Sequence, residues 1–278
     1  MKRIVITLVT CLFLISLSAQ EYPFSVTKTG SGKQALIFIP GFACSGEVWS
    51  ETISELKEYY TCYALTMPGF SGTEPQPNPT FNDWKTQIAQ FITTEQIQSP
   101  ILIGHSMGGG LALAIASEYR DILKKLIIVD ALPCLMALTN PGFKHNPNND
   151  CTNIINRITA MNDEQFIQMQ RISVATLCTE ASKHEEIINW GLKSDRQTYA
   201  QIYCDYSNTD LREQLKTITI PTLILLEPQF KPIESVINDQ YKNLPSAQIK
   251  YANKGLHFIM FDDKEWFINQ VKNYLGNQ

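Results

Sequence analysis

The chain has 278 residues, 44% of them hydrophobic, and a formal net charge of −4 at pH 7. This length and hydrophobic content suit one large domain, or a core with an inserted segment. The negative charge argues against nucleic acid as a partner and gives no basic patch for an anionic membrane. No C-x-x-C pair is present, so no zinc ribbon is expected, and the sequence specifies no oligomeric state.

Residues 1–19 have the pattern of a secretory signal peptide. Lys2 and Arg3 form a short basic region, residues 4–17 are apolar, and Ala19 is a small residue of the kind that a signal peptidase accepts. The apolar run is shorter than the ~20 residues that a membrane-spanning helix needs. We expect a secreted or periplasmic protein without a stable membrane anchor. The alternatives are a buried N-terminal strand and a lipid anchor.

Short apolar runs then alternate with longer amphipathic segments. Runs as apolar as these suit strands that are covered on both faces, as in a parallel sheet. Strands alternating with helices predict a doubly wound, mostly parallel α/β sheet. The runs are residues 35–40, 60–69, 99–106 and 124–133, and the helix-like segments are 45–59, 80–93 and 111–119.

The pattern changes after Asp130. Residues 132–150 are rich in Pro and Asn and predict a loop, whereas residues 151–215 have helical periodicity without a clear strand. Sheet character returns at residues 220–228 and 247–252. The expected organisation is an α/β core of residues 20–132 and 218–278, interrupted by a helical cap or lid of residues 133–217.

Six cysteines follow residue 19, and four of them lie between Cys134 and Cys204. An even number of cysteines permits disulfides in an oxidising compartment. We expect one or two bridges among these four, and buried free thiols are the alternative.

Residues 104–108, Gly-His-Ser-Met-Gly, fit the pattern G-x-S-x-G where an apolar strand meets a helix of small residues. The chain must reverse sharply there, which places Ser106 in a strained backbone conformation. Its hydroxyl would lie at the carboxyl edge of the sheet, above a helix N-terminus that stabilises an anionic intermediate. We predict that Ser106 is a nucleophile. The alternative is an ordinary Gly-rich turn.

The same turn offers the backbone N–H of Met107 as one donor of an oxyanion hole. The second donor is expected after the first long strand, in the segment "IPGFACSGEVW", from the backbone N–H of Phe42. The alternative is a simple turn with Phe42 packed in the core.

Several segments together resemble the α/β-hydrolase family, in its branch with a helical cap. The resemblance covers the whole mature chain and implies the α/β-hydrolase fold. Many relatives carry His-Gly in the oxyanion loop, and Pro40 replaces that histidine here. The matching segments are "IPGF", "MPGFSGT", "IGHSMGGG", "LIIVDALP", "IPTLILL" and "LHFIMFDDKEWF".

His257 is the expected catalytic base. It follows the last predicted strand and precedes the last helix, and the resemblance places the base of the family in this loop. It would take the proton from Ser106 and return it to the leaving alcohol. A structural or cap-facing histidine is the alternative.

The acid that orients His257 is less plainly marked. Most relatives place an Asp after the strand "TLILL", but that loop holds no Asp here, and Glu227, Glu234 and Asp239 are the candidates near it. We prefer Asp130, at the end of the strand after the nucleophile helix, where haloalkane dehalogenases and pancreatic-type lipases carry their acid. The alternatives are a backbone-binding role for Asp130 and a dyad without an acid.

Serine with histidine and an oxyanion hole indicates acyl transfer to water through an acyl-enzyme, with no metal or organic cofactor. We expect a serine hydrolase acting on small or medium carboxylic esters, while lactones and amides remain open. The apolar residues of 154–169 either line the substrate site or pack within the cap. A ligand-binding receptor with little turnover is the functional alternative, because the fold alone does not exclude it.

Overall fold

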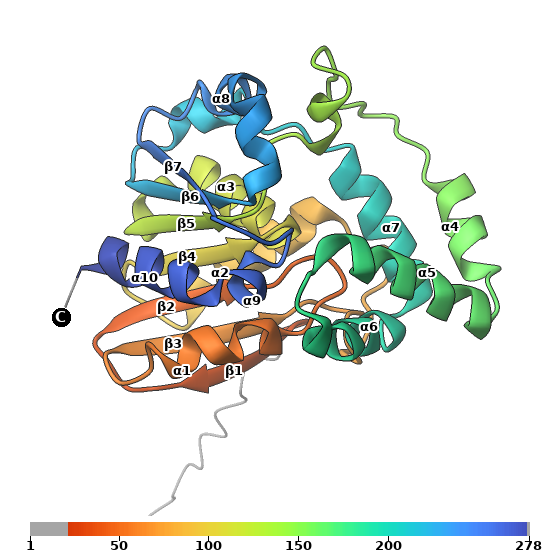
Figure 1. Ribbon diagram of the computed structural model, residues 1–278, viewed down its shortest axis with the longest axis horizontal. Helices are drawn as coiled ribbons and strands as arrows, with labels where there is room; N and C mark the ends of the chain where they lie inside the picture. The colour runs from red at the N-terminus through yellow and green to blue at the C-terminus, as the bar shows by residue number, and fades with distance from the viewer. Residues whose placement is uncertain (1–21, 277–278) are drawn as a thin grey trace, which may run out of the picture.

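Seven strands form one sheet in the order β1-β3-β2-β4-β5-β6-β7 (Figure 1). The computed structural model describes residues 22–276. Strand β1 runs antiparallel to β3 and the other neighbours are parallel, so the predicted mostly parallel sheet is confirmed. The strands are β1 Ser25–Thr29, β2 Gln34–Ile39, β3 Tyr60–Thr66, β4 Ile101–His105, β5 Lys125–Val129, β6 Thr222–Leu226 and β7 Ala247–Tyr251.

Helices cover both faces of this sheet because successive strand side chains point to opposite sides. In β4, Leu102 packs with the core on one face and Ile103 with the core on the other, and both are fully buried. Helices α2 (Phe81–Thr94), α3 (Met107–Glu118) and α8 (Glu234–Tyr241) cover the first face. The second is covered by α1 (Ser50–Ser54), α9 (Ile259–Asp262) and α10 (Lys264–Leu275).

Four helices lie between β5 and β6 and gather at one side of the sheet, on the right in Figure 1. They have a small core of their own around Phe166, Ile158 and Ala200. Several apolar residues of 154–169 pack in this small core, as expected if they pack within the helical segment and do not line the substrate site. We call these helices the α4–α7 segment: α4 Thr152–Thr159, α5 Asp163–Leu177, α6 His184–Leu192 and α7 Arg196–Ser207.

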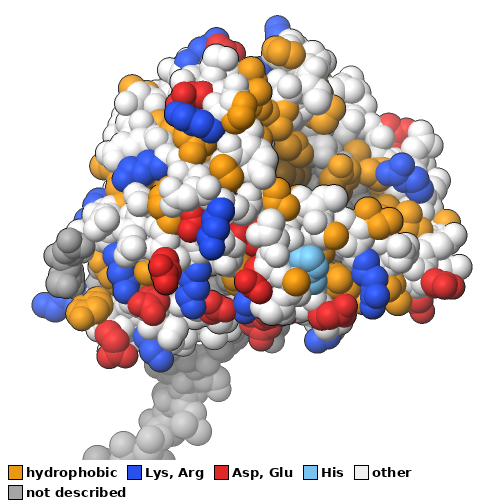
Figure 2. Space-filling model, viewed as in Figure 1, with side chains coloured by type: hydrophobic (Ala, Val, Ile, Leu, Met, Phe, Trp, Pro, Cys, Tyr) orange, Lys and Arg blue, Asp and Glu red, His pale blue; other side chains and the backbone are white. Residues whose placement is uncertain are grey.

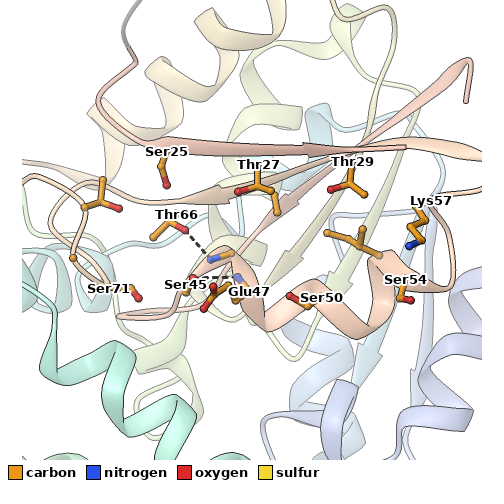
Figure 3. Close-up of a pocket in the computed structure, with 15 residues that line it drawn as sticks. Ser25, Thr27, Thr29, Ser45, Glu47, Ser50, Ser54, Lys57, Thr66 and Ser71 are labelled. Carbon is orange, nitrogen blue, oxygen red and sulfur yellow. Dashed lines mark hydrogen bonds between the residues drawn. The ribbon is translucent and has the colours of Figure 1, made fainter. Parts of the chain in front are cut away.

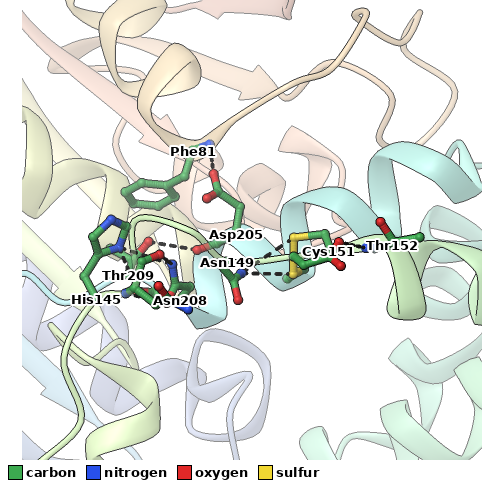
Figure 4. Close-up of a disulfide and its surroundings, with 11 residues drawn as sticks. Phe81, His145, Asn149, Cys151, Thr152, Asp205, Asn208 and Thr209 are labelled. Carbon is green, nitrogen blue, oxygen red and sulfur yellow. Dashed lines mark hydrogen bonds between the residues drawn. A yellow bond between two sulfur atoms is a disulfide. The ribbon is translucent and has the colours of Figure 1, made fainter.

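One disulfide, Cys151–Cys204, joins the beginning of α4 to α7 (Figure 4). It lies within the region where one or two bridges were expected. Cys134 and Cys178 of the same region are buried free thiols. The bridge therefore fixes the first helix of the α4–α7 segment to the last.

The predicted signal peptide, residues 1–19, lies outside the described residues. Between residues 22 and 276, no helix combines the length and the apolar character needed to cross a bilayer. Figure 2 shows acidic and basic side chains interspersed on the face that it draws, without a large patch of one sign.

Candidate active site

Ser106 sits at the bend between β4, which ends at His105, and α3, which begins at Met107. Its backbone has φ 53° and ψ −122°, a conformation that costs free energy in a residue with a side chain. The turn requires glycine at two places: a Cβ on Gly104 would lie 2.2 Å from the carbonyl oxygen of Gly108, and one on Gly108 would lie 2.3 Å from that of Ile39. The sequence pattern thus produces the strained elbow expected of it.

The loop after β2 lies against this elbow. A Cβ on Gly41 would come within 2.7 Å of His105 Nδ1, so only glycine allows the loop to approach so closely. Ala43 has a positive φ of 56°, which turns the chain immediately after Phe42. Met107, as the first residue of α3, carries one of the amides that find no acceptor within a helix. Both backbones considered as oxyanion donors therefore belong to segments in contact at the elbow.

The side chain of Phe42 packs with aromatic rings from the loop after β3 and from α7. Its ring centroid is 5.2 Å from that of Phe70 and 4.5 Å from that of Tyr199 on α7, both in edge-to-face geometry. The side chain thus joins the loop to the α4–α7 segment.

His257 and Asp130 are in direct contact. Nδ1 of His257 lies 2.6 Å from Oδ2 of Asp130, whose side chain is 1% exposed. The other oxygen, Oδ1, accepts a hydrogen bond of 2.7 Å from the backbone N–H of Glu227. Asp130 itself has a positive φ of 45°, so the two residues brought to this edge of the sheet from β4 and β5, Ser106 and Asp130, are both strained.

This contact governs the protonation of the imidazole. Burial disfavours the charged ring and by itself lowers the pKa of His257. The hydrogen bond and the charge of Asp130, together with the charge of Glu227, outweigh that effect and raise the pKa. A proton taken up at Nε2 would therefore be stabilised by the two carboxylates.

The other acid candidates lie elsewhere or in a different environment. Glu234 pairs with Lys231 and Asp239 with Lys242, both at the surface. Glu227 follows β6, and burial together with the charge of Asp130 raises its pKa to about 7. Of these four carboxyl groups, Asp130 alone makes a hydrogen bond to His257 among the described residues.

Ser106 and His257 line one cavity of about 110 Å³. Within residues 22–276 the Ser106 hydroxyl makes no hydrogen bond; such contacts often form only in the complex with substrate. The walls are mainly apolar, and α5, α6 and α7 supply several of the lining residues. The cavity is lined by Gly41, Phe42, Ala43, Cys44, His105, Ser106, Gln170, Ser173, Val174, Leu177, Ile187, Gly191, Tyr199, His257 and Phe258.

A second, wider groove of about 430 Å³ lies between β1 and the segment of α1 (Figure 3). Hydroxyl side chains such as Thr27, Ser50 and Thr66 line it. None of the predicted site residues is among its lining residues, so it is separate from the cavity of Ser106.

His105 makes a contact that sequence reasoning missed. Its fully buried ring places Nε2 3.0 Å from the backbone oxygen of His257. Burial, and then the neighbouring His257, hold the pKa of His105 well below its ordinary value, so the ring is neutral and can donate this hydrogen bond. The motif placed His105 beside the nucleophile, but nothing in it marked a link to a residue 152 positions away.

The chain matches a known protein family and shares its fold with solved proteins. The family described as "alpha/beta hydrolase fold" matches residues 34–264, most of the chain. The chain belongs to the α/β-hydrolase family. A solved thermophilic esterase from Thermogutta terrifontis superposes with a TM-score of 0.75 at 20% identity, covering 91% of this chain and 92% of that one.

Curated relatives of this α/β hydrolase carry enzyme names. The pimeloyl-[acyl-carrier protein] methyl ester esterase of Wigglesworthia glossinidia brevipalpis is 27% identical over 72% of this chain and 76% of its own length. The N-formylmaleamate deformylase of Pseudomonas putida is 22% identical over 89% of this chain and 91% of its own length. These names support an enzyme of the hydrolase type.

The same comparison corrects the expected localisation. Relatives named for an ester carried on acyl-carrier protein contradict the expectation of a secreted or periplasmic protein. That expectation depended on residues 1–19, an N-terminal stretch whose apolar pattern is open to more than one interpretation.

Proposed function

We propose that this α/β hydrolase is a serine esterase with Ser106 as nucleophile, His257 as general base and acid, and Asp130 as the acid that orients His257. The proposal is carried by the 2.6 Å contact between His257 and Asp130 at the cavity that also holds Ser106. The enzyme names of the relatives support the reaction class.

The first step is attack of Ser106 Oγ on the ester carbonyl while Nε2 of His257 removes the hydroxyl proton. Asp130, bound to Nδ1, fixes the tautomer that leaves Nε2 free to accept. The backbone N–H groups of Phe42 and Met107 donate to the oxyanion of the tetrahedral intermediate. Nε2 then protonates the departing alcohol, which leaves an acyl-enzyme that water hydrolyses by the same steps.

The cavity limits the size of the group that it can enclose. Its volume of about 110 Å³ is smaller than an apolar cavity of ~150 Å³ that holds benzene. The cavity is open to solvent, so the rest of a substrate can extend beyond it, and we propose a small or medium carboxylic ester as the substrate. The α4–α7 segment, which supplies one wall, would act as a cap or lid.

The decisive experiment compares three variants on p-nitrophenyl esters. Ser106→Ala should abolish turnover and labelling by a fluorophosphonate, and Asp130→Asn should lower kcat by up to about 10⁴-fold, because the histidine loses its correct tautomer. Glu234→Gln, a surface control, should stay close to the unmodified enzyme. Circular dichroism checks that each variant is folded.

Two outcomes would contradict the proposal. Full activity in Asp130→Asn with loss of activity in Glu227→Gln or Glu234→Gln would move the acid to another position. No turnover and no labelling of the unmodified protein would favour the ligand-binding alternative.

A further inference from the structure

His105 lies between the nucleophile and the base, and the mechanism proposed above gives it no role. It is the last residue of β4 and immediately precedes Ser106. Its side chain is 1% exposed and faces the loop of the base, where Nε2 lies 3.0 Å from the backbone oxygen of His257. One side chain thus connects the two segments that carry Ser106 and His257.

The contacts of this ring fix its tautomer. A carbonyl oxygen only accepts hydrogen bonds, so Nε2 of His105 carries the proton that is donated to His257. Nδ1 is buried without a hydrogen-bond partner among the described residues, and a Cβ on Gly41 would come within 2.7 Å of it. A second proton at Nδ1 would be a buried donor without an acceptor, which is costly. The ring is therefore a neutral donor directed at the loop of the base.

The ring is held on both sides. On the side of the sheet, His105 pairs with Val129 of β5, whose carbonyl oxygen accepts a hydrogen bond of 2.8 Å from the backbone N–H of Ser106. On the side of the loop, the centroid of the ring is 4.6 Å from that of His257 and 4.9 Å from that of Phe258. The donor is thus fixed relative to the sheet that also places the nucleophile.

The residues on either side of His257 are attached to helices. The backbone N–H of Leu256 donates to Asp262 of α9, and that of Phe258 donates to the carbonyl oxygen of Leu177 on α5. In the part of the chain that the structure describes, the bond from the buried ring is the only hydrogen bond between this loop and β4. The position of the base relative to the nucleophile therefore depends on that bond.

We propose that His105 is a positioning residue, which sets the distance between the imidazole of His257 and the hydroxyl of Ser106 by donating to the backbone oxygen of His257. This inference rests on the serine esterase function proposed above. Proton transfer needs the base within about 2.6–3.2 Å of the hydroxyl, and a misplacement of about 1 Å can cost about 10²-fold in rate. Loss of the donor should therefore slow the chemical step more than it weakens substrate binding.

The test compares two substitutions of similar length on p-nitrophenyl acetate. His105→Met has no donor, so it should lower kcat by about 10–100-fold while KM changes by no more than about twofold. His105→Gln keeps an N–H donor near the position of Nε2 and should recover most of the lost kcat. The rate of labelling by a fluorophosphonate should follow the same order, because it reports the reactivity of Ser106 directly.

His184→Met is the matched control. Nε2 of His184 lies 2.8 Å from the backbone oxygen of Cys178, which is a bond of the same kind, but His184 does not line the cavity of Ser106. This variant should keep the kcat of the unmodified enzyme. Circular dichroism and urea denaturation show at which temperature each variant is folded, and kcat is measured there.

A third variant keeps the test decisive if His105→Met does not fold. His105→Asn places its N–H donor near Nδ1, on the wrong side of the ring, so it should lose kcat like His105→Met, whereas His105→Gln should not. The comparison of Asn with Gln then tests the position of the donor between two polar side chains.

The outcomes separate this inference from the function on which it rests. Unchanged kcat in folded His105→Met or His105→Asn would overturn the role of His105 and leave the esterase intact. An equal loss in these variants and in His105→Gln would also overturn it, since packing of the ring and not its donor would then account for the loss. Absence of turnover and of labelling in the unmodified protein would overturn both proposals.

Discussion

At the scale of single residues, Asp130 makes two contacts that correspond to roles the sequence presented as alternatives. One carboxylate oxygen binds the backbone N–H of Glu227, and the other contacts His257. A bond to local backbone therefore does not compete with orientation of the histidine, because a carboxylate has two oxygens with separate lone pairs. The backbone bond holds the carboxylate in the orientation that His257 requires.

Glu227 adds a charge whose ionisation opposes folding. Burial, and then the charge of Asp130, raise its pKa to about 7 from an ordinary value of 4.5. The group is protonated below pH 4.5 in both folded and unfolded chains, so its cost to folding grows from pH 4.5 to 7 and stays constant above. Glu227→Gln should therefore gain stability over the unmodified protein above pH 7, by at most about 3 kcal/mol and less because solvent reaches part of the side chain.

Urea denaturation at pH 4.5 and pH 8 measures this difference, and Glu234→Gln serves as a surface control. The charge of Glu227 also helps to raise the pKa of His257. The acidic limb of kcat/KM, where the base becomes neutral and active, should consequently move to lower pH in Glu227→Gln. Identical stability differences at the two pH values would contradict the environment described for this carboxyl group.

At the scale of elements, Asp262 at the end of α9 joins the α4–α7 segment to the loop of His257. Its carboxylate accepts hydrogen bonds from the backbone N–H groups of Thr179 and Glu180, which follow α5, and of Leu256, next to His257. Burial works against the ionised form, but these bonds prevail and lower the pKa of Asp262. The stability that the carboxylate contributes is present above its ordinary pKa of 3.8 and is lost as the pH falls below it.

Asp262→Asn should lower the free energy of unfolding by about 2–4 kcal/mol at pH 7, because several hydrogen bonds to a charged acceptor are weakened together. It should also lower kcat, since the backbone beside His257 loses an anchor. Asp239→Asn, at an exposed ion pair, is the control and should change neither quantity. A variant as stable as its parent would show that this link between the two elements carries little free energy.

At the scale of the whole molecule, the disulfide Cys151–Cys204 closes a loop that contains most of the α4–α7 segment. The two cysteines are 53 residues apart, and the chain-entropy relation gives about 4 kcal/mol for a loop of this length. The double variant Cys151→Ser, Cys204→Ser should lose about 2–4 kcal/mol in urea denaturation. Activity should change little, because neither cysteine lines the cavity.

Reductant provides an independent check of that prediction. It should destabilise the unmodified protein by a similar amount and leave the double variant unchanged, because Cys134 and Cys178 are free thiols already. Equal unfolding curves for the unmodified protein with and without reductant would contradict the stabilising role of the bridge.

The sequence by itself determined the alternation of strands and helices, the elbow at Ser106 and the loop of His257. These features are local: apolar runs specify buried strands, and glycines at 104 and 108 are needed wherever the chain turns so sharply. Local patterns also have limits. The short basic and apolar N-terminus predicted secretion, and the names of the relatives contradict that localisation.

The tertiary structure alone decided which carboxylate contacts His257, which backbone oxygen His105 contacts and which residues of α5 line the cavity. Asp130 and His257 are 127 positions apart, and the parallel order of β5, β6 and β7 brings their loops to one edge. Helical periodicity predicted helices within residues 151–215, but which residues of α5 line the cavity depends on how the α4–α7 segment packs over that edge. Contacts between distant segments depend on the packing of whole elements, and no pattern within one segment encodes them.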